Sequence, residues 1–199
     1  MGKVNILPLF SIPIIETTLN EYISVDNFEL VNFNSNASSS KDIRVLEKFP
    51  DVREGILEKF QKAVDKYLFY SNKFAISTSW FAVLNKGDSS PVHSHKHSYW
   101  SGIYYFGDYE DGESSPLLII NPLGEISDFS LDAENLNPFN AGHYLVKPEK
   151  GKLIFFPSYL RHQILSHQSN TSRESLAFNI VPVGEYGFVD STYNTNWFK

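Results

Sequence analysis

The stretch "SSPVHSHKHSYWSGIYYF", residues 89–106, places three of the chain's six histidines directly before an apolar run. Side chains on a strand alternate between its two faces, so His93 and His95 are expected to share a face. His97 would join them only if the segment stayed extended that far. A polar surface loop is the ordinary interpretation of any one histidine. Three of them at the entrance of an apolar strand nevertheless indicate a candidate metal site.

The residues on either side of this stretch predict a series of short strands. Apolar runs bounded by Gly, Pro, Asn and Asp occur at 74–84, 100–106, 116–120, 143–147, 152–157, 160–166 and 175–183. Such runs after a single helix are typical of a sandwich, barrel or jelly roll, and not of a doubly wound sheet. Sixteen Phe and eleven Tyr residues also favour a β-rich interior. The segment "KPEKGK" (147–152) predicts a tight hairpin turn between two of the runs.

Ahead of these runs, the sequence predicts one amphipathic helix near residues 52–70. Apolar residues recur there at helical spacing, at Ile56, Leu57, Phe60, Val64 and Leu68. Asp51, followed by Glu54 three positions later, resembles a capping box. The preceding segment "NFNSNASSSK" (32–41) is expected to be a surface loop.

Composition limits the kinds of protein and of site that are possible. A chain of 199 residues is long enough for one domain and short for two. We expect a single domain over 1–199, made of a strand and helix region (1–73), a β core (74–183) and a C-terminal extension (184–199). Because the chain has no cysteine, disulfides, thiolate metal sites and a cysteine nucleophile are excluded. Any metal must therefore take nitrogen and oxygen ligands.

The charge and the N-terminal segment bear on partners and location. The net charge of −6 argues against a nucleic-acid partner, since proteins that bind nucleic acids are normally basic. The N-terminal segment is apolar but is broken by Asn5, Pro8 and Pro13, which does not match a signal peptide. No run approaches the length of a membrane span. We therefore expect a soluble, cytoplasmic protein without a membrane partner, in the host cytoplasm if a phage encodes it.

A metal site needs a further ligand from a distant part of the chain. In "KLIFFPSYLRHQIL" (152–165), His162 follows an apolar run, and a buried strand that ends in a turn is a common way to present such a ligand. His143 and His167 are alternatives with less apolar surroundings. An ordinary, partly buried histidine remains the other interpretation of His162.

An arginine begins the next apolar run, "SRESLAFNI" (172–180), with Arg173 and Ser175 on one face of the expected strand. Burial of an arginine costs desolvation energy unless an anion receives it. The alternative is a surface arginine that belongs to the polar loop before the strand.

In this order, His-x-His, a distant His and then Arg-x-Ser resemble the iron(II) and 2-oxoglutarate-dependent oxygenases. More narrowly, the chain resembles a family of such oxygenases found in bacteria and phages. The stretches that carry the resemblance are "SWFAVLNKGDSSPVHSHKHSYWSGIYYF" and "GKLIFFPSYLRHQI…RESLAFNI", which lie within 79–106 and 151–180. The combination of the two stretches is specific to this family, whereas either one alone is a weak signal.

The resemblance implies a mainly β fold, a double-stranded β-helix (a jelly roll, cupin-like) with an N-terminal helical segment packed on it. His93 and His162 match the two ligand histidines, and His95 lies where the wider superfamily has a carboxylate. Arg173 matches the arginine that binds the distal carboxylate of 2-oxoglutarate, with Ser175 beside it. Tyr104 or Tyr105 could add a hydrogen bond, and strand alternation leaves open which of them points inward.

The function that the resemblance implies is that of an iron(II)/2-oxoglutarate-dependent dioxygenase. It would use dioxygen and 2-oxoglutarate to hydroxylate an unidentified peptide or small molecule. A third histidine in place of the carboxylate makes the metal site more cationic, which suits an anionic 2-oxo acid. Two other hypotheses remain at this point: a three-histidine, cupin-like metalloenzyme that does not use 2-oxoglutarate, and a non-catalytic β-sandwich binding module of a phage.

Overall fold

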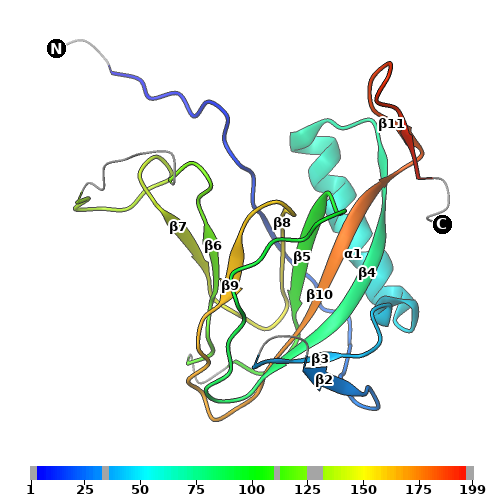
Figure 1. Cartoon of the computed structure of the whole chain (residues 1–199), viewed down its shortest axis with the longest axis vertical. Coiled ribbons are helices and arrows are strands. Elements are labelled where there is room, and N and C mark those ends of the chain that lie inside the picture. Colours follow the sequence, from blue (N-terminus) through cyan, green and yellow to red (C-terminus); the bar gives the residue numbers. More distant parts are fainter. Residues whose placement is uncertain (1–3, 33–35, 110–112, 125–131, 196–199) are drawn as a thin grey trace.

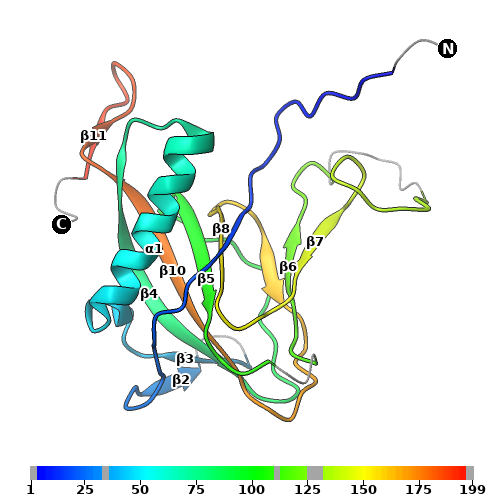
Figure 2. The ribbon, with the colours of Figure 1, turned by 180° about the vertical axis from the view of Figure 1, so that it is seen from behind.

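A seven-stranded antiparallel sheet forms the middle layer of the molecule, with a helix on one face and a three-stranded sheet on the other (Figures 1 and 2). The computed structural model describes residues 4–32, 36–109, 113–124 and 132–195. Within them, β11 (Glu185–Tyr186) and β12 (Tyr193–Asn194) form a separate small hairpin.

The large sheet has the strand order β1-β8-β5-β10-β4-β3-β2. Its strands are β1 (Ile15–Thr18), β2 (Leu30–Asn32), β3 (Ser38–Ser40), β4 (Lys73–Leu84), β5 (Trp100–Tyr105), β8 (Lys152–Pro157) and β10 (Arg173–Val183). The small sheet has the order β7-β6-β9, from β6 (Leu117–Ile120), β7 (His143–Val146) and β9 (His162–Ile164). All seven apolar runs predicted after residue 74 are therefore confirmed as strands, with ends that differ by a few residues.

Strand alternation in β10 separates two kinds of side chain, one on each face of the large sheet. The even-numbered residues Leu176, Phe178 and Ile180 belong to the core on the helix side. The odd-numbered residues start with Arg173 and Ser175 and face the small sheet, where a second apolar core lies. One face of the strand thus supports the fold, and the other can carry a site.

The predicted helix is confirmed, although it ends earlier than expected. α1 spans Pro50–Ala63, and a π-helical turn, η2 (Val64–Leu68), follows it. A short 3₁₀ helix, η1 (Val45–Glu47), precedes it. The buried face of α1 packs on the large sheet, where the Phe60 ring contacts those of Trp100 and Phe155 at centroid distances of 5.4 and 5.2 Å.

The predicted capping box is wrong. Phe49 is the N-cap residue, and no side chain caps the helix. Pro50 occupies the first turn, because its fixed φ suits a helix start and its missing N–H would have no partner there. Asp51 therefore lies inside the first turn, where its charge favours the helix dipole without capping it. Gly55 allows α1 to lie close to the chain before it, since a Cβ there would be 2.8 Å from the Leu19 side chain.

The predicted loop over 32–41 is wrong in part, because Leu30–Asn32 and Ser38–Ser40 pair as strands β2 and β3. Residues 33–35 lie outside the described residues. The serines fit a strand because their hydroxyls find partners: Ser40 Oγ donates to the Asp42 carbonyl and accepts from the Phe81 N–H. An apolar pattern is therefore not required at this edge of the sheet.

The segment 147–152 makes a turn, with Gly151 at φ +84°, but it does not close a hairpin. β7 pairs with β6 in the small sheet, whereas β8 pairs with β1 and β5 in the large one. The turn is thus a crossover between the two sheets. Such crossovers bring β9 and β10 to opposite sides of a shared interior.

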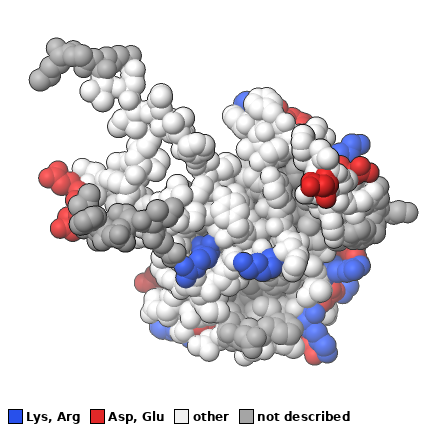
Figure 3. All heavy atoms as spheres, turned by 45° about the horizontal axis from the view of Figure 1, so that its top comes forward, with Lys and Arg blue, Asp and Glu red and all other residues white. Residues whose placement is uncertain are grey.

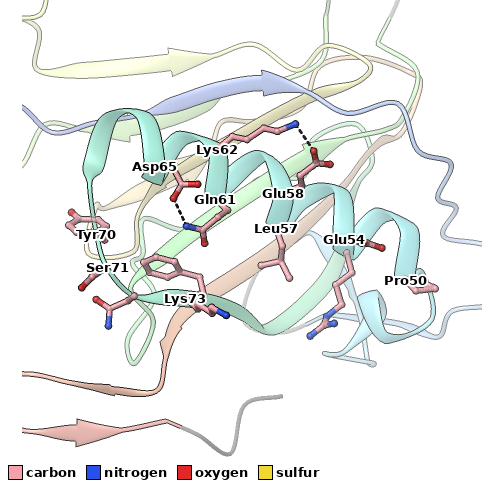
Figure 4. A pocket seen from close by; sticks show the side chains of 13 residues that line it. Pro50, Glu54, Leu57, Glu58, Gln61, Lys62, Asp65, Tyr70, Ser71 and Lys73 are labelled. Atoms are coloured by element: carbon pink, nitrogen blue, oxygen red, sulfur yellow. Dashed lines mark hydrogen bonds and ion pairs between the residues drawn. The ribbon is translucent and has the colours of Figure 1, made fainter.

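The surface offers a second hollow besides the interior between the sheets. A groove of about 950 Å³ runs between α1 and the start of β4, with Leu57 and Phe74 among its lining residues. Figure 4 shows two contacts along the helix in this groove, an ion pair between Glu58 and Lys62 and a hydrogen bond from Gln61 to Asp65.

On the face shown in Figure 3, two separate groups of Lys and Arg side chains lie near the middle, and others alternate with acidic side chains along one side. Among the described residues of this face, the basic side chains therefore do not form the continuous basic surface that is typical of nucleic-acid binding. None of the helices among the described residues combines the length and the apolar composition of a membrane span.

Candidate metal centre

Three of the histidines that the sequence singles out meet between the two sheets. His162 begins β9, and its backbone exchanges two hydrogen bonds with that of His93, at 2.9 and 2.8 Å. The backbone N–H of His95 donates to the Ser158 carbonyl at 3.0 Å. Possible ligand atoms of these three histidines all lie within 4.8 Å of one another. The predicted grouping of His93, His95 and His162 is therefore present.

The other histidines lie outside this cluster. His97 has φ +60° in a turn, so the extended segment ends before it and the condition for its joining the others is not met. His143 is exposed on β7. His167 is buried, where its Nδ1 accepts from the Ser115 N–H and its Nε2 faces the Thr171 carbonyl at 2.7 Å. His167 thus supports the loop structure.

Each of the three clustered rings has an oxygen atom beside its Nδ1. The partner is the Pro91 carbonyl for His93 and the Leu160 carbonyl for His162, both at 2.9 Å. A neutral imidazole that donates from Nδ1 to a carbonyl carries its lone pair on Nε2. This tautomer is the one that binds a metal through Nε2, with the outer hydrogen bond fixing the ring.

Burial keeps two of the three rings, those of His95 and His162, in their neutral form. The pKa of His162 is lowered to about 3, chiefly because the ring is buried and secondarily because His93 lies beside it. Burial also lowers the pKa of His95. Neutral imidazole is the metal-binding form, so these two rings are ready to bind a cation at neutral pH. The donor set of three nitrogens suits a transition metal such as iron(II).

Arg173 is the first residue of β10, on the face of that strand that is turned toward the small sheet, and it is fully buried. Its Nε donates to the Ser115 carbonyl at 3.0 Å, its Nη1 to Ser175 Oγ at 3.1 Å and its Nη2 to the Tyr105 hydroxyl at 3.4 Å. All three acceptors are neutral. Within the described part of the chain, the structure shows no ion pair for this guanidinium. The surface-loop alternative for Arg173 is therefore excluded.

The two tyrosines that alternation left open are now distinguished. Tyr105 is buried with its hydroxyl beside Arg173, whereas the Tyr104 hydroxyl donates to the Glu21 carbonyl at 2.9 Å on the helix side. β5 and β10 pair Tyr105 with Ser175 in register, which explains why both reach the same guanidinium.

A cavity of about 260 Å³ extends from the histidines to Ser175, whose hydroxyl accepts a hydrogen bond from Arg173. The three histidines and Ser175 all contribute to its wall. The remaining lining residues are small or apolar: Ala37, Ser39, Trp80, Ala82, Ser90, Pro91, Gly102, Ile103, Leu117, Phe156, Ile164 and Ala177. None of these side chains is acidic or basic. A bound metal and a bound anion would thus lie close together in a largely apolar space.

Two side chains at the histidine end were not anticipated from the sequence. Asn179 and Ser101 both lie beside Nδ1 of His95, at 2.7 and 2.9 Å. Both lie on cavity-facing positions of their strands, in register with each other. The alternation Arg173, Ser175, Ala177, Asn179 could have indicated Asn179, because a polar residue at the fourth position of a buried face needs a partner.

The architecture matches solved structures at low sequence identity, and a comparison with curated protein sequences finds no match. HygX from Streptomyces hygroscopicus, solved with nickel and 2-oxoglutarate bound, aligns with 88% of this chain and 82% of its own, at a TM-score of 0.57 and 12% identity. An oxidoreductase of the 2OG-Fe(II) oxygenase family from Burkholderia pseudomallei aligns with 77% of this chain and 72% of its own, at a TM-score of 0.53 and 11% identity. This likeness concerns the fold, a double-stranded β-helix.

The sequence itself matches a family model over residues 78–179, just over half of the chain, which includes the three clustered histidines and Arg173. The family is described as "Putative 2OG-Fe(II) oxygenase". Its members are oxidoreductases that use 2-oxoglutarate and iron(II), and this chain belongs to that family.

Proposed function

We propose that the chain is a hydroxylase in which His93, His95 and His162 bind iron(II) and Arg173 binds the distal carboxylate of 2-oxoglutarate. The observation that carries this proposal is the shared cavity: Ser175 contacts the Arg173 guanidinium and lines the same wall as the three histidines. A 2-oxo acid could therefore reach both ends of the site at once.

The proposed binding of the carboxylate rests on the burial and the hydrogen bonds of the Arg173 guanidinium. An arginine presents five N–H groups, and its three hydrogen bonds here all go to neutral oxygens. A buried guanidinium without a counter-ion is costly, and a carboxylate supplies both the charge and the acceptors. Ser115 adds to this, because its buried hydroxyl has no hydrogen-bond partner among the described residues and its carbonyl accepts from Arg173. The arginine end thus matches an anionic group of small size.

The binding of the metal follows from the three rings. Their Nδ1 atoms face oxygen atoms, and a ring that donates from Nδ1 to an oxygen leaves Nε2 for the cation. Iron(II) and 2-oxoglutarate, when bound, supply the oxygen activation and the oxidation of a C–H bond. The protein contributes the ligands, the orientation of the 2-oxo acid and an apolar wall that limits access of water.

The cavity wall also bears on the substrate. Apart from the histidines, its lining residues carry no titratable side chain, and Trp80 lies with its ring centroid 5.5 Å from that of His95. An ionised group would lose its hydration there without finding a partner. We therefore propose that the reacting part of the substrate is an uncharged C–H group, on either a peptide or a small molecule.

Formation of succinate without added substrate tests the proposed activity. Oxygenases of this type often consume 2-oxoglutarate slowly when no substrate is present. Protein reconstituted with iron(II) should release succinate above the level of the same preparation without iron. The Arg173→Leu variant provides the matched control, since it keeps the histidines. Succinate at the iron-free level in the wild type would contradict the proposal.

A further inference from the structure

The three ligand rings are held in two different ways. His93 and His162 face main-chain carbonyls only two residues earlier in the chain, those of Pro91 and Leu160. His95 instead faces two side chains, Asn179 at 2.7 Å and Ser101 at 2.9 Å. The first two contacts are set by local backbone geometry. The third depends on two side chains, one six and the other 84 residues away in sequence, so among these three contacts it is the one that a substitution can remove directly.

The direction of the Asn179 amide is fixed by its other end. Its Nδ2 donates to Thr78 Oγ1 at 2.9 Å, so its Oδ1 points toward His95. Oδ1 also accepts from the Ser101 hydroxyl at 2.8 Å. An amide oxygen has two lone pairs, so it can accept from Ser101 and from His95 together. The arrangement therefore selects His95 with its proton on Nδ1.

The strand pairing around Asn179 determines the direction of its side chain. Asn179 is paired with Thr78 on β4 and with Ser101 on β5, and the β10–β4 register shifts directly after it. Such a bulge re-aims the side chains beside it and increases the local twist. Ser101 is in turn held by Ser158, whose Oγ lies 2.8 Å away. The amide is thus held by side chains of the two strands on either side of β10.

We infer that Asn179 is the positioning residue for the third metal ligand: its amide oxygen holds the His95 ring so that Nε2 faces the ion shared with His93 and His162. This inference rests on the proposed metal site. Asn179 is a neutral acceptor, so it orients the ring without adding charge to a site that lacks a carboxylate ligand.

The test is the iron(II) affinity of the full chain, measured anaerobically against a chromophoric chelator. Asn179→Leu removes the acceptor at similar size and should weaken iron(II) binding by about 10- to 100-fold. Asn179→Asp keeps an oxygen at the same place and should stay within about threefold of the wild type. Asn121→Leu is the matched control, since that half-buried amide also makes two hydrogen bonds but contacts no histidine.

A second measurement distinguishes a change in the orientation of the His95 ring from a general destabilisation of the fold. The visible absorption of cobalt(II)-loaded protein reports the number of nitrogen ligands, and it should change in Asn179→Leu but not in Asn179→Asp or Asn121→Leu. If Asn179→Leu does not fold, Thr78→Val serves in its place. That variant frees the amide to turn, and we expect it to weaken iron(II) binding by about three- to tenfold.

The outcomes are distinct. Wild-type affinity in Asn179→Leu, or in Thr78→Val where that variant replaces it, would overturn the inference and leave the proposed function intact. An equal loss in the Leu and Asp variants would also overturn it, because the acceptor would then not be the relevant property. A wild type that binds no iron(II) would refute the proposed metal site, and the inference with it, before any variant is compared.

Discussion

The histidine cluster lines the cavity and Arg173 contacts Ser175 on the same wall, yet the histidines and the arginine come from contrasting parts of the fold. Arg173 is the first residue of an eleven-residue strand, in regular register with Leu84 on β4. His93 lies in a segment that makes only an isolated bridge to His162, and His95 follows without a ladder of its own. Regular strand pairing places the backbone of the arginine, whereas the backbone around His93 and His95 lies outside the strand ladders. Substitutions of the histidines and of Arg173 should therefore affect iron(II) binding and 2-oxoglutarate binding separately.

The largest effect is expected when the metal end is broken. His162→Ala should remove most of the iron affinity, because two neighbouring ligands do not complete a facial site. His97→Ala is the control, since that residue lies in a turn outside the cluster and should leave iron binding nearly unchanged. Iron content after reconstitution measures both. Equal losses in the two variants would show that the cluster is not the metal site.

Substitution of Arg173 should weaken 2-oxoglutarate binding without loss of the metal. Arg173→Leu should weaken 2-oxoglutarate binding by at least about tenfold, because loss of one partner of a buried charge pair costs roughly 2–5 kcal/mol. Iron content should stay close to that of the wild type. Arg161→Leu is the control, because an exposed arginine contributes little. Titration of each iron-loaded variant with 2-oxoglutarate measures the effect, and wild-type affinity in Arg173→Leu would exclude this arginine as the clamp.

Acid should destabilise the metal-free protein through the histidine end. The pKa of His162 is about 3 in the folded state against an ordinary value of 6.5, so below pH 6.5 the unfolded chain binds more protons. The free energy of unfolding should therefore fall by about 2 kcal/mol between about pH 6.5 and pH 5. His162→Leu should reduce this dependence, and the part due to the buried His95 should remain. Denaturant unfolding at the two pH values measures it, and an unchanged slope in the variant would contradict the assignment.

The smallest effects should separate the two neighbouring tyrosines. Tyr105→Phe removes a hydroxyl beside Arg173 and should weaken 2-oxoglutarate binding by about two- to tenfold. Tyr104→Phe should not affect that binding, but it should cost about 1 kcal/mol of stability through its lost bond to Glu21. The pair is compared by 2-oxoglutarate titration and thermal unfolding. The reverse pattern would place Tyr104 on the cavity side.

The strands and the helix were predictable because each depends on a local pattern. Apolar runs bounded by turn residues marked β4 to β10, and helical spacing marked α1. The serine-rich β3 was missed, since its strand is defined by pairing with β4 and by hydroxyl partners, not by apolar residues. The capping box failed because Pro50 takes the first helical turn.

The site was predictable in its composition but not in its supports. Spacing and resemblance named His93, His95, His162 and Arg173, and the structure brings the histidines together. The choice between Tyr104 and Tyr105 required the register of β5 against β10, which alternation alone does not supply. Asn179 was missed for a related reason. Its partner is 84 residues away in sequence, so only the folded sheet shows the contact.

The central claim is that one cavity binds iron(II) and 2-oxoglutarate together, at opposite ends. The most direct measurement is an anaerobic titration of the iron(II)-loaded protein with 2-oxoglutarate, followed by visible absorption. The account predicts a charge-transfer band that saturates in the wild type and in Arg161→Leu. In Arg173→Leu, the band should require at least about tenfold more 2-oxoglutarate. No band in wild-type protein that retains its iron would contradict the account and favour a three-histidine metalloenzyme that does not use 2-oxoglutarate.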